Sequence, residues 1–147
     1  GSVVTWGDAA FGADSRQVAT ELCNIHHVVG NQFAFAAVKT AGSVVSWGDP
    51  RYGGDSSMLM AELSSGVVQV FVSGGALAAV KTSGSVVTWG DSRHGGDSDE
   101  VRQEISRDVE EIAGTKSAFC AVKRDGSVVC WGDAGYGADC ASVSAEL

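Results

Sequence analysis

The chain has 147 residues, enough for one ordinary domain with a hydrophobic core. Its net charge of −8 disfavours a nucleic-acid-binding protein, because such proteins cluster Lys and Arg against phosphate groups. A hydrophobic content of 44% excludes a disordered chain, and no apolar run is long enough to insert into a membrane as a helix. A chain of this kind can still dock on a membrane-embedded complex.

The stretch Gly-Ser-Val-Val-Thr-Trp-Gly-Asp opens the chain and returns almost unchanged three more times. A period of roughly 42 residues indicates a tandem-repeat protein, in which each unit buries its apolar surface against its neighbours. We expect a single repeat domain, 1-147, with units at about 1-41, 42-83 and 84-125 and a partial unit at 126-147. The signature residues of the repeat are Trp6, Trp47, Trp89 and Trp131, together with Gly48, Gly90 and Gly132.

The second copy shows how the first half of a unit is expected to fold. Ser43–Trp47 is a short β-branched run typical of a strand. Tyr-Gly-Gly-Asp-Ser follows at 52–56, where the glycines turn the backbone and the Asp-Ser pair caps a helix. Leu59 and Leu63 then place one apolar stripe on a two-turn helix. The same spacing recurs at Val18 and Leu22, at Val101 and Ile105, and at Val143 and Leu147.

Two further strands complete the unit. Val67–Val72 reads as one strand, and Ala76–Lys81 as another whose small apolar residues suit a strand covered on both faces. The Thr-Ser-Gly that follows, at 82–84, is expected to turn the chain into the next Trp strand as a hairpin. Each unit is therefore predicted to be strand, short helix, strand, strand.

Residues 118–137, Ala-Phe-Cys-Ala-Val-Lys-Arg-Asp-Gly-Ser-Val-Val-Cys-Trp-Gly-Asp-Ala-Gly-Tyr-Gly, combine a small-apolar strand, an Asp-Gly turn, a strand ending in Trp-Gly and a glycine-rich loop. This pattern resembles the repeat of the regulator of chromosome condensation family, here in a short variant with Trp-Gly-Asp and Tyr-Gly-Gly-Asp-Ser motifs. The resemblance implies blade-like β units, typically of a seven-bladed propeller used for protein–protein contacts. Some relatives are exchange factors for a small GTPase and others are recognition modules of ubiquitin ligases. No exchange-factor loop can be placed by residue in this chain.

The expected fold is therefore a tandem-repeat protein, mainly β with one short helix per unit (α+β). Its propeller-blade-like units would form an open stack or an arc of a larger β-propeller. Because the chain begins inside a repeat and has an unmatched half-repeat at its end, we expect a piece of a longer protein. The strand Ser2–Trp6 lacks the preceding hairpin partner that Ser43–Trp47 possesses. We therefore expect further repeats, a second copy or a protein partner to cover it.

The repeated Gly-Asp-Ser, at 54–56 and 96–98, looks like the surroundings of a hydrolase nucleophile. A nucleophilic serine needs a positioned base, and none of His26, His27 and His94 recurs with it. We interpret this motif as helix capping and expect neither a catalytic residue nor a cofactor.

Paired aspartates six residues apart flank each glycine-rich loop, as in Asp49 with Asp55 and Asp91 with Asp97. Oxygen ligands on a turning loop suit calcium, so an ion-binding repeat is an alternative function. No third carboxylate recurs with them, which favours turn and cap roles and no metal site.

The four cysteines lack a metal-ligand pattern, and three of them replace small residues at repeat positions of the last unit. Cys120 and Cys130 flank a Lys-Arg-Asp-Gly-Ser turn, so a three-residue hairpin loop would place them opposite each other. The simpler hypothesis is that the cysteines merely substitute for other small residues. The alternative hypothesis is a disulfide between Cys120 and Cys130.

The function predicted from these features is non-catalytic. We expect a scaffold that mediates protein–protein contacts, with a place as peripheral subunit of a larger assembly. The alternatives are a recognition module of a larger enzyme of ubiquitin-ligase or exchange-factor type, an ion- or ligand-binding repeat, and an accessory subunit of an organellar, photosynthetic complex.

Overall fold

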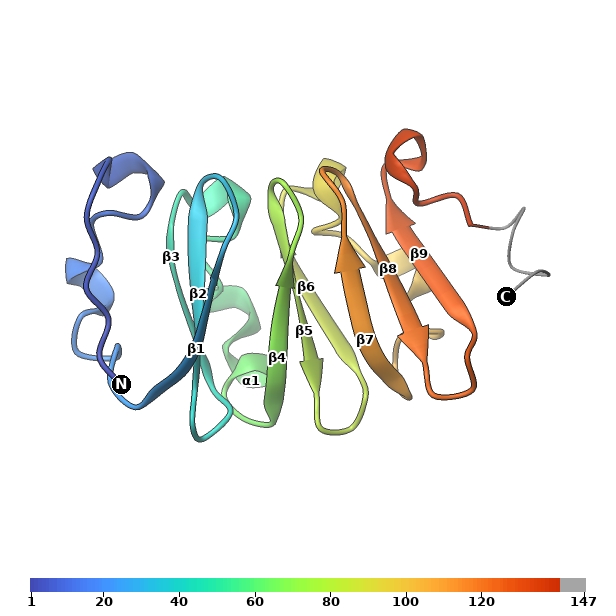
Figure 1. The fold of residues 1–147 in the computed structure, drawn as a ribbon, viewed down its shortest axis with the longest axis horizontal. Helices are drawn as coiled ribbons and strands as arrows, with labels where there is room; N and C mark the ends of the chain where they lie inside the picture. Colours follow the sequence, from blue (N-terminus) through green and yellow to red (C-terminus); the bar gives the residue numbers. More distant parts are fainter. Residues whose placement is uncertain (141–147) are drawn as a thin grey trace.

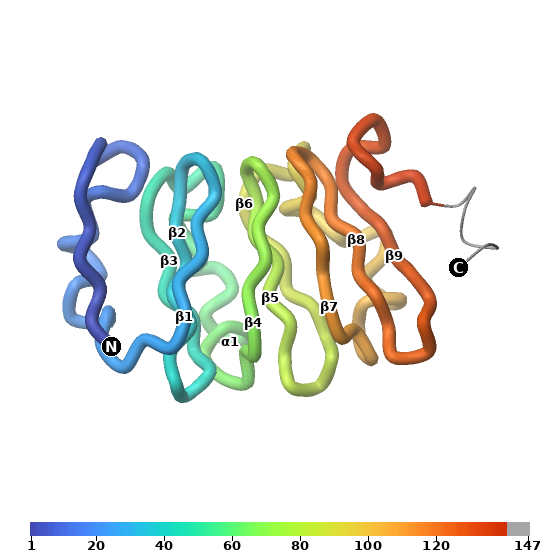
Figure 2. The backbone as a smooth tube through the Cα atoms, in the orientation of Figure 1, coloured from blue at the N-terminus to red at the C-terminus, as the bar shows by residue number. Residues whose placement is uncertain are grey.

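The computed structural model describes residues 1–140, which form three antiparallel sheets of three strands each. Within a sheet the strands are neighbours in chain order, and the three sheets stand side by side in an open row, with the N-terminal segment at one end and β9 at the other (Figures 1 and 2). This arrangement confirms the predicted class, a mainly β repeat protein of propeller-blade-like units. The strands are β1 Ile25–Gly30, β2 Ala34–Lys39, β3 Val44–Gly48, β4 Val67–Val72, β5 Ala76–Lys81, β6 Val86–Gly90, β7 Val109–Gly114, β8 Ala118–Lys123 and β9 Val128–Gly132.

Each second hairpin of a sheet closes through a glycine, as predicted. In the second sheet the Gly84 amide donates to the Lys81 carbonyl, and Gly84 has φ +76°, a left-handed conformation that costs glycine little. Gly42 and Gly126 occupy the same place with φ +80° and +85°. The hairpins therefore hold β2, β5 and β8 in the middle of their sheets.

The hydrophobic core lies between the sheets. The middle strand β5 is buried from Ala76 to Val80, which confirms the prediction of a strand covered on both faces. Ala76 and Ala78 face β7 and β8, whereas Leu77 and Ala79 belong to the core shared with the first sheet. A third core joins the N-terminal segment to the first sheet. Each blade therefore buries its apolar surface on its neighbours, as a repeat architecture requires.

In the first and third units the helical part is shorter than predicted, because a 3-10 helix of three residues replaces the two-turn helix. In the second unit the 3-10 helix Ser57–Leu59 leads directly into α1, Met60–Leu63, the one α-helix within residues 1–140. The apolar i, i+4 pairs still serve the core, since Leu63 and Ile105 are buried and Leu59 and Val101 pack against them. So short a helix gains little from its own hydrogen bonds, and packing against the next sheet decides its conformation. The pair Val143 and Leu147 lies outside the described residues.

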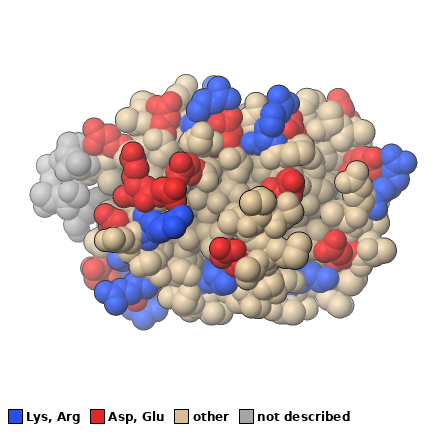
Figure 3. Space-filling model, turned by 180° about the vertical axis from the view of Figure 1, so that it is seen from behind, with Lys and Arg blue, Asp and Glu red and all other residues tan. Residues whose placement is uncertain are grey.

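The 3-10 helices of residues 1–140 lie in the loops that follow each Trp-Gly strand. Those directly after the strand are Ala9–Phe11, Pro50–Tyr52, Ser92–His94 and Ala134–Tyr136, and those later in the loop are Arg16–Val18, Ser57–Leu59 and Asp99–Val101. No helix among residues 1–140 has the length and apolar character to span a membrane. Acidic and basic side chains are interspersed on the face seen in Figure 3.

Candidate functional site

The tryptophans of the repeat join neighbouring units. The indole Nε1 of Trp47, Trp89 and Trp131 donates a hydrogen bond to a glycine carbonyl oxygen in the loop of the preceding unit. The acceptors are Gly12, Gly53 and Gly95, at 2.9, 3.0 and 3.0 Å respectively. All three indoles are buried, so each bond is made away from water, where an unpaired N–H or carbonyl would be costly. The Trp is therefore an inter-blade contact.

The glycine after each tryptophan allows close backbone packing. Gly90 has φ +106°, and a Cβ placed on it would lie 2.8 Å from both the Gly75 carbonyl oxygen and the Ala76 Cα. Gly48 and Gly132 have φ +114° and +111° and meet the equivalent backbone atoms. Only glycine combines this conformation with this approach, which explains the Trp-Gly pair physically.

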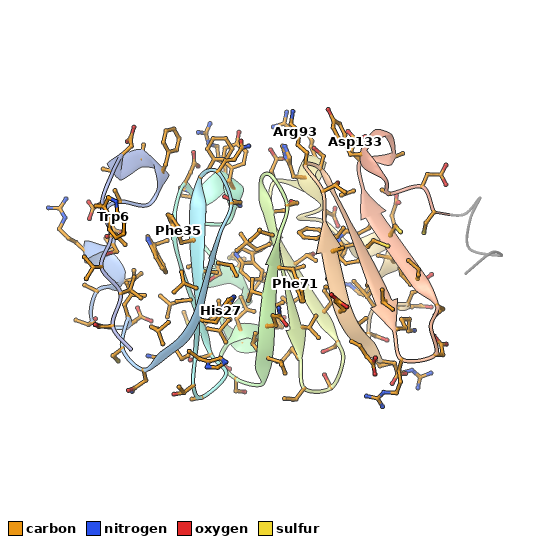
Figure 4. The ribbon with its side chains drawn as sticks, viewed as in Figure 1. Trp6, His27, Phe35, Phe71, Arg93 and Asp133 are labelled. Atoms are coloured by element: carbon orange, nitrogen blue, oxygen red, sulfur yellow. The ribbon has the colours of Figure 1, made fainter. Side chains whose placement is uncertain are left out.

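Trp6 is the exception among the four tryptophans. It is 85% exposed, and it lies on the N-terminal segment at one end of the row (Figure 4). Val4 is 78% exposed, whereas the ring of Phe11 faces the first sheet, 5.6 Å from the ring of Phe33. Within the described residues, the segment Ser2–Trp6 has only one β-bridge, between Ser2 and Cys23. We call the surface formed by Val4 and Trp6 the N-terminal end face. Their equivalents in the next unit, Val45 and Trp47, are buried.

The opposite end of the row carries the complementary half of the contact. Gly137 has a positive φ of +105°, as Gly12, Gly53 and Gly95 also have positive φ, but no atom of residues 1–140 lies within 4 Å of a Cβ placed on it. At the three inner positions that space is occupied by Phe35, Leu77 or Phe119. Tyr136 and Val122 are exposed at this C-terminal end of the described residues. The loop at residues 133–137 (Asp133 is labelled in Figure 4) has the same 3-10 turn and left-handed glycine as the loops that accept the tryptophan bonds.

The aspartates proposed as ion ligands hold the loops together. Asp49 and Asp91 each accept a backbone N–H through Oδ1, and both of their oxygens accept from the guanidinium of Arg51 or Arg93. The hydrogen bond from Arg93 lowers the pKa of Asp91 to about 2, and the bond from Arg51 likewise lowers the pKa of Asp49. These carboxylates therefore start the 3-10 turn and fix the arginine.

The second aspartate of each pair caps the later turn. Asp55 and Asp97 accept the backbone N–H two residues on, at 2.9 Å in both cases, and this bond lowers the pKa of Asp55. Asp55 and Ser56 were both expected as helix caps, and only Asp55 caps the turn. The Ser56 hydroxyl makes no cap hydrogen bond, because it pairs with the Ser46 hydroxyl at 2.8 Å. Within residues 1–140 no group of three or more His, Cys, Asp or Glu side chains is placed to hold a metal ion. Ion binding by these loops stays an untested prediction.

The two cysteines singled out in the sequence do meet. Cys120 and Cys130 are paired residues of β8 and β9, and their sulfur atoms lie 3.0 Å apart as free thiols. The hairpin geometry behind the disulfide hypothesis is thus as expected, while the disulfide itself stays a prediction. His26 and His27 lie on β1, and His94 lies in the loop after β6 beside Asp91.

Sequence reasoning missed the acceptor of the tryptophan bond. The first glycine of Tyr-Gly-Gly-Asp-Ser was expected only to turn the backbone, and in the structure its carbonyl oxygen also accepts a hydrogen bond from the next Trp. The available signal was the nearly constant spacing of 35 or 36 residues between this glycine and the Trp one unit later, at positions 12 and 47, 53 and 89, and 95 and 131.

These features define the class of fold: antiparallel three-stranded, propeller-blade-like units joined through a Trp–glycine contact. Comparison with solved structures supports this class. Human WBSCR16 matches with a TM-score of 0.55 and 20% identity over 74% of this chain and 33% of its own. The ectodomain of the Arabidopsis thaliana receptor kinase ACR4 matches at 0.52 and 21%, over 74% and 38%.

A third similar structure is Prp20p of Saccharomyces cerevisiae, also called yeast RCC1, with a TM-score of 0.53 and 16% identity over 74% of this chain and 30% of its own. The structure is described with the binding of Prp20p to Gsp1p and histones. The present chain thus spans about a third of the length of these proteins. No protein-family model and no curated protein sequence matches the chain.

Proposed function

We propose that this chain is a non-catalytic repeat scaffold that binds a protein partner through its N-terminal end face. The observation that carries the proposal is the exposure of Trp6. Three equivalent indoles are buried against a glycine loop, whereas the indole of Trp6 is 85% exposed. An exposed Trp on the same face of an extended segment as exposed Val4 is an apolar surface of the kind that marks protein interaction sites.

The chemistry of the partner follows from the internal contacts. If Trp6 binds as the other tryptophans do, its indole N–H donates a hydrogen bond to a backbone carbonyl at a tight turn, as Trp89 donates to Gly53. Ser2–Trp6 is an extended segment of the same type as β3, which pairs with β2 from Ala34 to Val38. A partner that adds an extended strand to this edge and offers a turn carbonyl to the indole would satisfy both requirements. Another repeat of this type has both features, so we expect a partner that is itself repeat-like.

The similar structures support a binding role without identifying the partner. Prp20p is described with its binding to Gsp1p and histones, and a structure of yeast RCC1 is of a complex with Kap60. The identity of the protein that binds the N-terminal end face would distinguish the three assignments: part of a larger enzyme, of an organellar complex or of a purely structural protein.

Photo-crosslinking tests the proposal. A benzophenone amino acid replaces Trp6 in one protein and Met58, which is 93% exposed in a different loop, in the control. In native extract we expect a crosslinked protein from position 6 alone, which unlabelled wild-type protein competes away and the Trp6→Ala variant does not. Equal crosslinking from both positions, or none from position 6, would contradict the proposal.

A further inference from the structure

Three of the four cysteines meet at the last blade. The Cys120 and Cys130 sulfur atoms are 3.0 Å apart, and Cys140 lies near enough to Cys130 to contribute to raising its pKa. Cys23 is exposed on the N-terminal segment, near Lys39. The three thiols come from β8, from β9 and from the loop after β9, so they are close only because the blade has folded.

The equivalent positions in the other units explain why Cys140 lies there. Each of those units has a hydroxyl–hydroxyl hydrogen bond between the Trp strand and the loop that follows it. The pairs are Thr5 with Ser15, Ser46 with Ser56, and Thr88 with Ser98, at 2.9, 2.8 and 2.9 Å. In the last unit this pair is Cys130 and Cys140. The fold therefore places these two sulfur atoms where it elsewhere places a bonded pair of hydroxyls.

Cys120 adds a third thiol at a position occupied elsewhere by a buried alanine. Its equivalents Ala36 and Ala78 are fully buried, facing the next sheet. The Lys123 amide bonds to the Ser127 carbonyl and the Asp133 amide to the Ser117 carbonyl, so by alternation Cys120 and Cys130 form a non-hydrogen-bonded pair. Side chains approach most closely in such pairs, and their Cα spacing lies within the range that a disulfide spans.

We propose that Cys120, Cys130 and Cys140 form a thiol–disulfide exchange site in which Cys130 is the shared partner. A small-molecule disulfide such as oxidised glutathione supplies the oxidation. Two protein thiols become one disulfide, and the oxidant leaves as two thiols. The third protein thiol can then attack the Cys130 sulfur, which forms a new S–S bond and releases the former partner as a thiol. This exchange needs no further oxidant, and one proton passes from the attacking to the released cysteine.

The surroundings of the three thiols set their order of reaction. Burial, and then the neighbouring thiols, raise the pKa of Cys130. Cys120 and Cys140 are partly exposed, so an oxidant in solution reaches them before Cys130. Cys130 then displaces glutathione from whichever of the two carries it.

The two disulfides would have different structural effects. A Cys120–Cys130 bond joins adjacent strands within the last sheet. A Cys130–Cys140 bond ties the loop at 133–140 to β9, in place of the hydroxyl bond used by the other units. The site thus selects between a free and a fixed loop. It does not depend on the proposed binding at the N-terminal end face.

Peptide mapping of the intact protein separates the two forms. Trypsin cleaves after Lys116, Lys123 and Arg124, so Cys120 falls in fragment 117–123 while Cys130 and Cys140 share fragment 125–147. A Cys120–Cys130 bond joins two tryptic fragments, whereas a Cys130–Cys140 bond lies within one. Cleavage before Asp133 then separates Cys130 from Cys140. After treatment with oxidised glutathione and alkylation of free thiols, we expect both disulfides, each containing Cys130.

Variants that restore the equivalent residues one repeat earlier, Ala78, Thr88 and Ser98, are the matched controls. We expect Cys140→Ser to retain only the Cys120 link, Cys120→Ala to retain only the Cys140 link, and Cys130→Thr to form no internal disulfide. Cys23→Ser should leave the wild-type pattern unchanged. A Cys120–Cys140 bond in the Cys130→Thr variant at the wild-type yield would overturn the proposal. So would the absence of either expected link from the wild-type map, which decides the matter even if a variant fails to fold.

Discussion

Replacing Trp89 should destabilise the protein far more than the same replacement of Trp6. Trp89 is 5% exposed and bonds to the Gly53 carbonyl, whereas Trp6 is 85% exposed. Trp89→Phe keeps most of the ring but leaves a buried carbonyl unpaired, which costs about 1–3 kcal/mol. Trp89→Ala adds a cavity, for a total of about 3–5 kcal/mol. At Trp6 both changes should stay within about 0.5 kcal/mol.

Urea unfolding followed by far-UV circular dichroism measures these differences without relying on tryptophan fluorescence. A domain of this kind has about 5–15 kcal/mol of stability in total, so the alanine variant should show a clearly lower midpoint. The two phenylalanine variants are the sharpest comparison, because they differ only in the unit that is changed. If Trp89→Phe and Trp6→Phe unfold at the same midpoint, the inter-blade bond does not stabilise the fold and our reading of Trp6 as an unfilled contact loses its basis.

Three further predictions concern the glycines and the aspartates. Gly90→Ala should lower the free energy of unfolding by at least about 2 kcal/mol, because the new Cβ would lie 2.8 Å from backbone atoms. Gly126→Ala should lower it by only about 1 kcal/mol, because Gly126 has φ +85° but no described atom within 4 Å of the new Cβ. Equal losses in thermal unfolding would exclude the close backbone approach as the cause. The bond from Arg93 lowers the pKa of Asp91 from 3.8 to about 2, so the bond stabilises the fold fully above pH 3.8 and this stabilisation is lost as the pH falls towards 2. Asp91→Asn should therefore flatten the acid side of a curve of unfolding free energy against pH. An unchanged acid side would refute this. Titration with calcium should produce neither heat nor a melting shift, because arginine and backbone N–H groups already bind the first aspartate of each inner pair; a saturable heat would establish the ion-binding alternative instead.

Much of the blade could be predicted because its signals are local. Strand alternation, the hairpin glycines and the apolar run of Ala76–Lys81 each depend on neighbouring residues only. The two-turn helix was wrong in the first and third units for a related reason. Val101 and Ile105 have helical spacing, but only Asp99–Val101 forms a 3-10 helix, and both side chains still pack in the core. Apolar spacing records which residues are buried, and a 3-10 helix followed by turns satisfies it as well as a regular helix.

The site was harder to predict because its contacts join different units. That Trp89 receives its carbonyl from Gly53 depends on how blades stack, which the order of residues within one unit does not contain. The exposed indole of Trp6 was anticipated only indirectly, from the missing hairpin partner of Ser2–Trp6. The pairing of Cys120 with Cys130 was predictable, since hairpin register follows from loop length. The proximity of Cys140 was not, because it depends on the conformation of a glycine-rich loop.

The direction of the tryptophan bond makes the row of blades polar. Each of the three buried indoles donates to the unit before it in the chain, so each blade is stabilised by a loop that has already been synthesised. During translation a new blade can therefore dock as soon as its own Trp strand emerges. The polarity also means that stability depends on the number of junctions between blades, which is always one fewer than the number of units in an open array. Lengthening such an array by one unit should therefore stabilise every blade in it, including those far from the addition.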